Sequence, residues 1–208
     1  MQKKWIRIFA ACLMCFQLIT TTACAADVVP QDKPTEEAPS VVPIRTGGMI
    51  YIPDRSVYFA DVNVGYKWAF HAIDYLANTG VVSGTGNLIY SPAQTLSRAD
   101  FVLMLYRAYD MQKYTTEERF ADVPENAYYA KAVNAARAIG IVTGGTKNDF
   151  RPAAKLTRQD AMVLLKRTLD RTGLAFKAAD LSKFTDGKKV APYATESVAA
   201  LVDAGVIS

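Results

Sequence analysis

A short motif of a hydroxyl residue, an arginine and a carboxylate occurs twice in this 208-residue chain, sixty positions apart. It reads LSRAD from Leu96 and LTRQD from Leu156. Three glycines, Gly80, Gly140 and Gly205, bring much longer segments into register. The aromatic residues twelve positions before these glycines are Trp68, Tyr128 and Tyr193. Repetition at a fixed period indicates a fold built from stacked copies of one supersecondary unit.

The third copy is shorter than the other two. FADV begins at Phe59 and at Phe120, and the weaker match FTDG begins at Phe184. After Gly205 the third copy lacks the turn, the arginine motif and the segment that follows it. The expected organisation is a signal peptide at 1–25, a linker at 26–48, and repeats at 49–112, 113–174 and a partial one at 175–208.

Each copy has a helical pattern, so the chain is expected to be mainly α. Apolar residues recur at helical spacing, which predicts first helices over 66–78, 127–138 and 192–203 and second helices over 98–109 and 158–170. Gly80, Gly140 and Gly205 stand where a helix end favours the left-handed conformation. Gly84 and Gly144 follow a short apolar pair and indicate turns with positive φ.

The arginine motif resembles the start of a helix, but capping explains only part of it. Ser97 and Thr157 are the expected N-caps, and a carboxylate follows each at the third helical position, Asp100 and Asp160. The arginines between them, Arg98 and Arg158, have no capping role. Because the helix dipole is positive at this end, a cation there is unfavourable unless an anion binds. We therefore expect the backbone N–H groups and the guanidinium to face a bound anion.

The first 25 residues have the layout of a secretory signal peptide, with basic residues, an apolar run and then small residues. Cleavage after Ala25 is favoured. The alternative is a lipoprotein anchored at Cys24, although Thr21 stands where lipoprotein signals usually have leucine. All three cysteines lie in this segment, so cleavage after Ala25 leaves a mature chain without disulfides. The proline-rich stretch that follows is expected to be an extended linker.

Composition excludes several classes of function. Without the three cations of the signal segment the chain has 21 basic and 20 acidic residues, so net charge gives no reason to expect a nucleic-acid partner. No membrane span is expected in the mature chain. Catalytic and nucleotide-binding motifs such as GxSxG, HExxH or a P-loop do not occur. No enzymatic activity, metal or cofactor is expected, and the single histidine, His71, is expected at the surface.

The first two copies resemble S-layer homology repeats. The resemblance rests on a series of motifs in the same order: FADV, the aromatic Trp68 or Tyr128, GVVSG or GIVTG, a proline, and LSRAD or LTRQD. The resemblance covers 59–110, 120–170 and 184–208. It departs from the family pattern in several places: Asp100 and Asp160 replace Glu, Gln159 replaces Ala, and Tyr128 and Tyr193 replace Trp.

The resemblance implies a pseudo-threefold helical spindle that holds secreted proteins on the bacterial envelope without a covalent bond. Its implied ligand is a secondary cell-wall polysaccharide with pyruvyl ketals, whose carboxylates meet Arg98 and Arg158. Gly84 and Gly144 then offer turn N–H groups. Trp68 and Tyr128 either stack on sugars or, as we favour, form the core or the groove wall.

Two other functions stay open on the sequence. The chain is an assembly protein if the incomplete third repeat pairs with a partner chain. It is a lipoprotein if Cys24 carries a lipid, in which case the repeats act as a spacer to the wall. Otherwise it is expected to be secreted and held at the cell wall.

Overall fold

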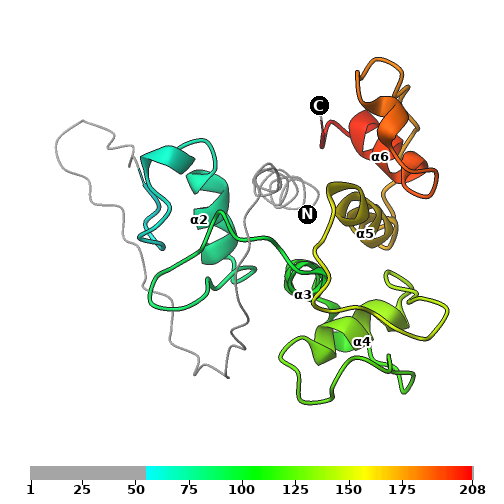
Figure 1. Ribbon diagram of the computed structural model, residues 1–208, viewed down its shortest axis with the longest axis horizontal. Helices are drawn as coiled ribbons and strands as arrows, with labels where there is room; N and C mark the ends of the chain where they lie inside the picture. Colours follow the sequence, from blue (N-terminus) through cyan, green and yellow to red (C-terminus); the bar gives the residue numbers. More distant parts are fainter. Residues whose placement is uncertain (1–54, 208) are drawn as a thin grey trace.

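The computed structural model describes residues 55–207, and this part of the chain is mainly helical, as expected (Figure 1). The α-helices within it are α2 (Phe70–Asn78), α3 (Arg98–Ala108), α4 (Ala130–Ala138), α5 (Arg158–Asp170) and α6 (Thr195–Asp203). Short 3-10 helices are η2 (Val64–Tyr66), η3 (Met111–Lys113) and η4 (Gly187–Lys189). The expected signal peptide, Cys24 and the linker lie outside the described residues.

The first helix of every repeat begins three or four residues later than the apolar spacing predicted. Its N-cap is Ala69 in α2, Tyr129 in α4 and Ala194 in α6, and none of these side chains makes a capping hydrogen bond. The register aromatics, of which Trp68 and Tyr128 are two, therefore stand in the turn before the helix. From this turn Tyr128 and Tyr193 reach the preceding repeat through their hydroxyl groups.

The first helices all end at a glycine in the left-handed conformation. The φ angles are +72° at Gly80, +74° at Gly140 and +67° at Gly205. At the end of α2 the N–H of Val81 donates to the carbonyl of Leu76 at 2.9 Å, and equivalent bonds close α4 and α6. This is the Schellman motif, and it turns the chain back toward the core at the same point in each copy.

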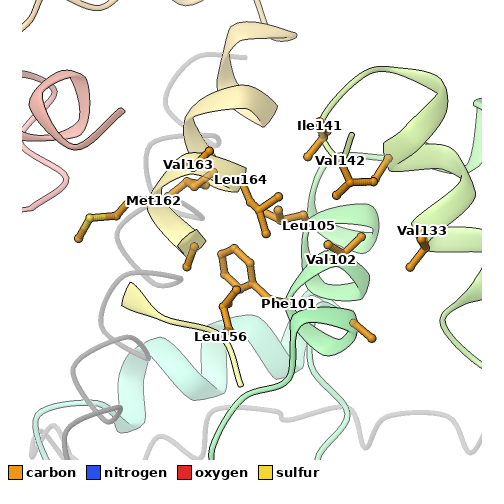
Figure 2. Packing of buried hydrophobic residues seen from close by; sticks show 14 of the residues in the cluster. Phe101, Val102, Leu105, Val133, Ile141, Val142, Leu156, Met162, Val163 and Leu164 are labelled. Carbon is orange, nitrogen blue, oxygen red and sulfur yellow. The ribbon is translucent and has the colours of Figure 1, made fainter. Parts of the chain in front are cut away.

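The helices pack across the repeat boundaries. The second helix of one copy contacts the first helix of the next, so α3 packs on α4 and α5 on α6, while α3 also contacts α5 (Figure 1). The larger core cluster spans all four of these helices. In Figure 2, Leu105 of α3 lies beside Leu164 of α5, with Phe101 below them. Around α2 there is a smaller cluster, which reaches Ala108 at the end of α3.

An aspartate near the start of each complete repeat fixes a loop far along the chain. Asp122 accepts hydrogen bonds from the backbone N–H groups of Phe150 and Arg151, at 2.8 and 2.7 Å. In the first repeat Asp61 accepts the equivalent hydrogen bonds from the backbone N–H groups of Tyr90 and Ser91, at 2.9 and 2.7 Å. Aspartates in such positions commonly cap the turn that follows them. These two carboxylates instead close a loop about half a repeat long and hold Arg151 at a φ of +61°.

Candidate ligand-binding site at the starts of the second helices

The hydroxyl residue and the carboxylate of each arginine motif form one hydrogen-bonded cap. Ser97 is the N-cap of α3; its Oγ accepts from the N–H of Asp100 at 3.1 Å and donates to Asp100 Oδ2 at 2.6 Å. Thr157 caps α5 with the same two bonds to Asp160, at 3.2 and 2.5 Å. One oxygen of each carboxylate is left to accept a further donor.

That donor is a tyrosine from the next repeat. The hydroxyl of Tyr128 donates to Asp100 Oδ1 at 2.6 Å, and that of Tyr193 donates to Asp160 Oδ1 at 2.7 Å. Burial, with the bonded carboxylate as a second cause, raises the pKa of both tyrosines above the ordinary value. The two departures from the family pattern, Asp for Glu and Tyr for Trp, are therefore the two halves of one contact.

The register aromatics are partly exposed and are not buried core residues. Their exposed fractions are 44% for Trp68, 46% for Tyr128 and 59% for Tyr193. The hydroxyls of Tyr128 and Tyr193 are bound at the junction. These exposures do not fit a place in the core; whether the rings form the groove wall or stack on sugars stays a prediction.

Arg98 is half-buried among groups of both charges. Its guanidinium lies over the ring of Phe150, 5.2 Å from the centroid, and its Nε is buried without a hydrogen-bond partner in the described part of the chain. Burial is the main cause that lowers the pKa of Arg98; Asp160 opposes the shift, and Arg167 and Arg151 add to it. A half-buried cation with an unused donor favours an anion.

Arg158 occupies the same place in the second motif but is exposed. Its neighbour Gln159, another departure from the family pattern, accepts a hydrogen bond from the N–H of Ala191 at 3.1 Å. Gln159 therefore ties the start of α5 to the third repeat. The small residue at the equivalent position of the first motif, Ala99, is 1% exposed.

The backbone at the start of α3 is not free to bind a ligand. The N–H of Arg98 donates to the carbonyl of Ala154 at 2.9 Å, and that of Ala99 donates to Pro152 at 3.0 Å. The expectation that these N–H groups face an anion is wrong for α3, because the loop of the second repeat already occupies them. An anion at this motif is left with the arginine side chain.

Gly84 and Gly144 lie at turns, and their neighbours are aromatic. Their φ angles are +71° and +73°, and a Cβ at either position would collide with the ring of the repeat's leading phenylalanine, Phe59 or Phe120. Both the conformation and the close approach require glycine. These features give the two glycines a structural role; whether their N–H groups also bind a ligand stays a prediction.

Sequence reasoning missed one pair of arginines. Arg107 and Arg167 donate through Nη1 to the carbonyls of Val81 and Ile141, at 3.3 and 3.1 Å. Each joins the second helix of a repeat to the segment after the first helix of the same repeat. Their spacing of sixty residues is the signal that would have found them. The guanidinium of Arg167 also adds positive charge near Arg98.

These observations define a class of protein, a helical repeat module whose copies interlock and present an arginine at each junction. The S-layer homology domain model matches residues 58–102, 119–162 and 183–208, which together make up more than half of the chain. The chain belongs to this family. The third match covers only the front half of the unit, in agreement with the partial third repeat.

Similar proteins include the surface-layer 125 kDa protein of Lysinibacillus sphaericus, 31% identical over 71% of this chain and 12% of that protein. The exoglucanase XynX of Acetivibrio thermocellus is 29% identical over 78% of this chain and 15% of its own length. The cellulosome-anchoring protein of that species is 26% identical over 57% and 27%. The match therefore spans only a small part of each relative, and the enzymes match through their S-layer homology region.

None of the helices in 55–207 is long and apolar enough to cross a membrane. In the same range no group of three or more histidine, cysteine, aspartate or glutamate side chains is placed to hold a metal ion.

Proposed function

We propose that this chain anchors a protein to the bacterial cell surface by binding an anionic, pyruvylated wall polysaccharide. Arg98 and Arg158 are the ligands for ketal carboxylates, and Trp68 and Tyr128 form the wall against which the sugar lies. Gly84 and Gly144 contribute turn N–H groups. Two weak sites on one polymer give a stronger attachment than either alone.

The observation that carries this proposal is the state of Arg98. Its Nε has no hydrogen-bond partner among residues 55–207 and its pKa is lowered by burial, so the side chain is costly to keep in this position without a ligand. A carboxylate would supply both the missing acceptor and the missing charge. The anchoring and surface-layer names among the relatives add independent support.

The test is a pull-down of the purified protein on cell-wall sacculi, with and without their pyruvyl ketals. Arg98→Ala should weaken binding about tenfold, as for one lost charge-assisted hydrogen bond, and Arg98→Ala with Arg158→Ala should reduce it to background. Arg55→Ala is the matched control, because Arg55 is exposed and lies ahead of the first segment that the family model matches, 58–102. Circular dichroism of each variant separates loss of binding from loss of fold. Binding that ignores the ketals, or that survives in the folded double variant, would refute the proposal.

One contact favours a second function, assembly with a partner chain. Tyr128 and Tyr193 each bind a carboxylate of the preceding repeat, whereas no preceding repeat faces Trp68 in residues 55–207. A second helix from a partner at this position would complete a pseudo-threefold spindle. The molar mass from sedimentation equilibrium decides: a mass that rises with concentration favours assembly, and a constant monomer mass counts against it.

A further inference from the structure

In each repeat one backbone N–H helps to hold the segment that leads into the repeat, two positions before the leading phenylalanine. The residues concerned are Val57, Glu118 and Ser182. In the first repeat the N–H of Val57 donates to Asp74 Oδ2 at 3.1 Å, and the hydroxyl of Ser56 donates to the other oxygen of that carboxylate. Asp74 belongs to α2, so this segment is bound to the helix that follows it.

The third repeat binds the same N–H within a turn. The N–H of Ser182 donates to Asp180 Oδ1 at 2.8 Å, only two residues back in the chain. The helix residue that corresponds to Asp74, six positions before the glycine that ends the helix, is Ala199, which has no side-chain acceptor. The first repeat has Arg55 in the place of Asp180, and arginine has no acceptor either. Each of these repeats therefore has one side-chain acceptor for this N–H, and the N–H binds it.

The second repeat has both acceptors. The N–H of Glu118 donates to Thr116 Oγ1 at 3.1 Å, within a turn as in the third repeat. Asn134 of α4 stands where the first repeat has Asp74, and its Oδ1 is closed to solvent and has no hydrogen-bond partner within residues 55–207. A buried acceptor without a donor is costly, whereas water can replace the N–H at the partly exposed Thr116. Hydrogen bonding therefore favours transfer of this N–H to Asn134, and the cost of moving the chain opposes it.

The connection between the first two repeats has room for this movement. Its residues 112–119 are exposed apart from Thr116, which is half-buried. A hollow of about 380 Å³, whose lining includes Asn134, lies between this connection and α4. The ends are fixed, because Met111 is buried and the carbonyl of Arg119 accepts a side-chain hydrogen bond from the second repeat at 2.8 Å. A segment held at both ends beside a hollow can swing in its middle.

The side chain of Glu118 already reaches α4. It forms an ion pair with Arg137 at 3.2 Å, and Arg137 lies one helical turn after Asn134 on the same face. The Glu118 side chain is 78% exposed, so this pair is a weak tether. It holds the connection near Asn134 without fixing the backbone there.

We propose that residues 112–119 form a strap with two positions, in which the N–H of Glu118 binds either Thr116, as in this structure, or Asn134 of α4. Closing the strap narrows the hollow and joins the segment after α3 to α4 by a further hydrogen bond, which stiffens the first repeat junction. The second junction lacks this choice, since Ala199 offers no side-chain acceptor. None of the strap residues belongs to an arginine motif, so the inference does not depend on wall binding.

The test is amide hydrogen exchange and ¹⁵N relaxation dispersion at Glu118 in the labelled full chain. Movement between the two strap positions should give relaxation dispersion on the microsecond-to-millisecond timescale. Thr116→Ala removes the acceptor in the turn and should shift the strap to Asn134, so that the Glu118 amide exchanges with solvent about tenfold more slowly than in the parent. If the strap has one position only, the same substitution leaves this N–H to water, and its exchange becomes faster.

Two further variants complete the test. Asn134→Ala gives α4 the residue found at this place in α6; it should abolish the dispersion at Glu118 and, combined with Thr116→Ala, should remove the slow exchange. Thr115→Ala is the matched control, because it removes an exposed hydroxyl from the same connection and should leave Glu118 unchanged. Circular dichroism confirms that each variant is folded. The inference fails if Thr116→Ala speeds exchange at Glu118, if dispersion persists in Asn134→Ala, or if Thr115→Ala acts as Thr116→Ala does.

Discussion

At the start of α3 the loop of the second repeat covers the helix end, whereas the start of α5 is open. Both ends have the same cap and the same carboxylate–tyrosine contact. Only the first has carbonyls of the following repeat on its N–H groups and an aromatic ring beneath its arginine. Two nearly identical sequences thus give one half-buried arginine and one exposed arginine.

This difference predicts how strongly each site holds an anion. Charge interactions weaken as the surroundings become more polar and are screened by salt when the groups are exposed. A carboxylate at Arg98 should therefore be bound more tightly and with less dependence on salt than one at Arg158. The neighbouring repeat, and not the motif itself, determines the strength of the site.

The largest expected effect comes from removing the carboxylate that holds the covering loop. Asp122→Ala removes two charge-assisted hydrogen bonds and should lower the free energy of unfolding by about 3 kcal/mol. Released from Phe150, Arg98 should resemble Arg158, which the NMR signal of its Nε–H would report. Asp61→Ala is the matched control, since it removes the same bonds from the first loop and should leave the Arg98 signal in place. An unchanged Arg98 signal in folded Asp122→Ala would mean that the loop does not set its environment.

A smaller effect should distinguish the two arginines directly. Arg98→Met keeps the packing over Phe150 and removes a half-buried charge whose Nε is unpaired, so it should raise the free energy of unfolding by about 1 kcal/mol. Arg158→Met changes an exposed side chain and should stay within about 0.5 kcal/mol of the parent. Urea unfolding without ligand measures both. A destabilised Arg98→Met would indicate that the arginine is a structural residue.

The smallest effect concerns the contacts that the two motifs share. Tyr128→Phe and Tyr193→Phe each remove one hydrogen bond to a carboxylate, for which we expect a loss of about 1 kcal/mol or less at neutral pH. The folded protein raises the pKa of both tyrosines above the ordinary 10.0. Their contribution is therefore fully present below about pH 10 and is lost as the pH rises further.

Urea unfolding between pH 8 and pH 11 tests this dependence. The parent should lose stability above about pH 10 more steeply than the double phenylalanine variant, so that the difference between the two curves narrows toward pH 11. Parallel curves over the whole range would show that these phenols do not contribute through their hydroxyl groups.

The features that the sequence predicted well are local ones. Ser97 and Thr157 cap their helices because a hydroxyl and the N–H three residues later belong to the same turn. Gly80 and its two equivalents end their helices because the left-handed conformation strongly favours glycine at that position. Aligning the three copies on these residues was enough to recognise the family and the partial third copy.

The features that could not be predicted join distant segments. Nothing near Asp122 in the sequence indicates that it binds a loop 28 residues away. The late starts of α2, α4 and α6 have no capping side chain to announce them. The carbonyls that cover the start of α3 come from the next repeat, so the free N–H groups expected there are not free. Tertiary contacts override local expectation at each of these places.

The packing of α3 on α4 and of α5 on α6 has a consequence for how such chains grow. A duplication event copies the unit from one FADV to the next, but the hydrophobic interfaces combine the back half of one copy with the front half of its neighbour. The repeat seen in the sequence and the pair of helices that pack together are thus offset by half a repeat. A cut at residue 113, between the sequence repeats, would separate α3 from α4 and expose both halves of an interface, whereas an added whole copy always meets a matching surface. Growth by whole copies is therefore tolerated, and excision of an isolated copy is not.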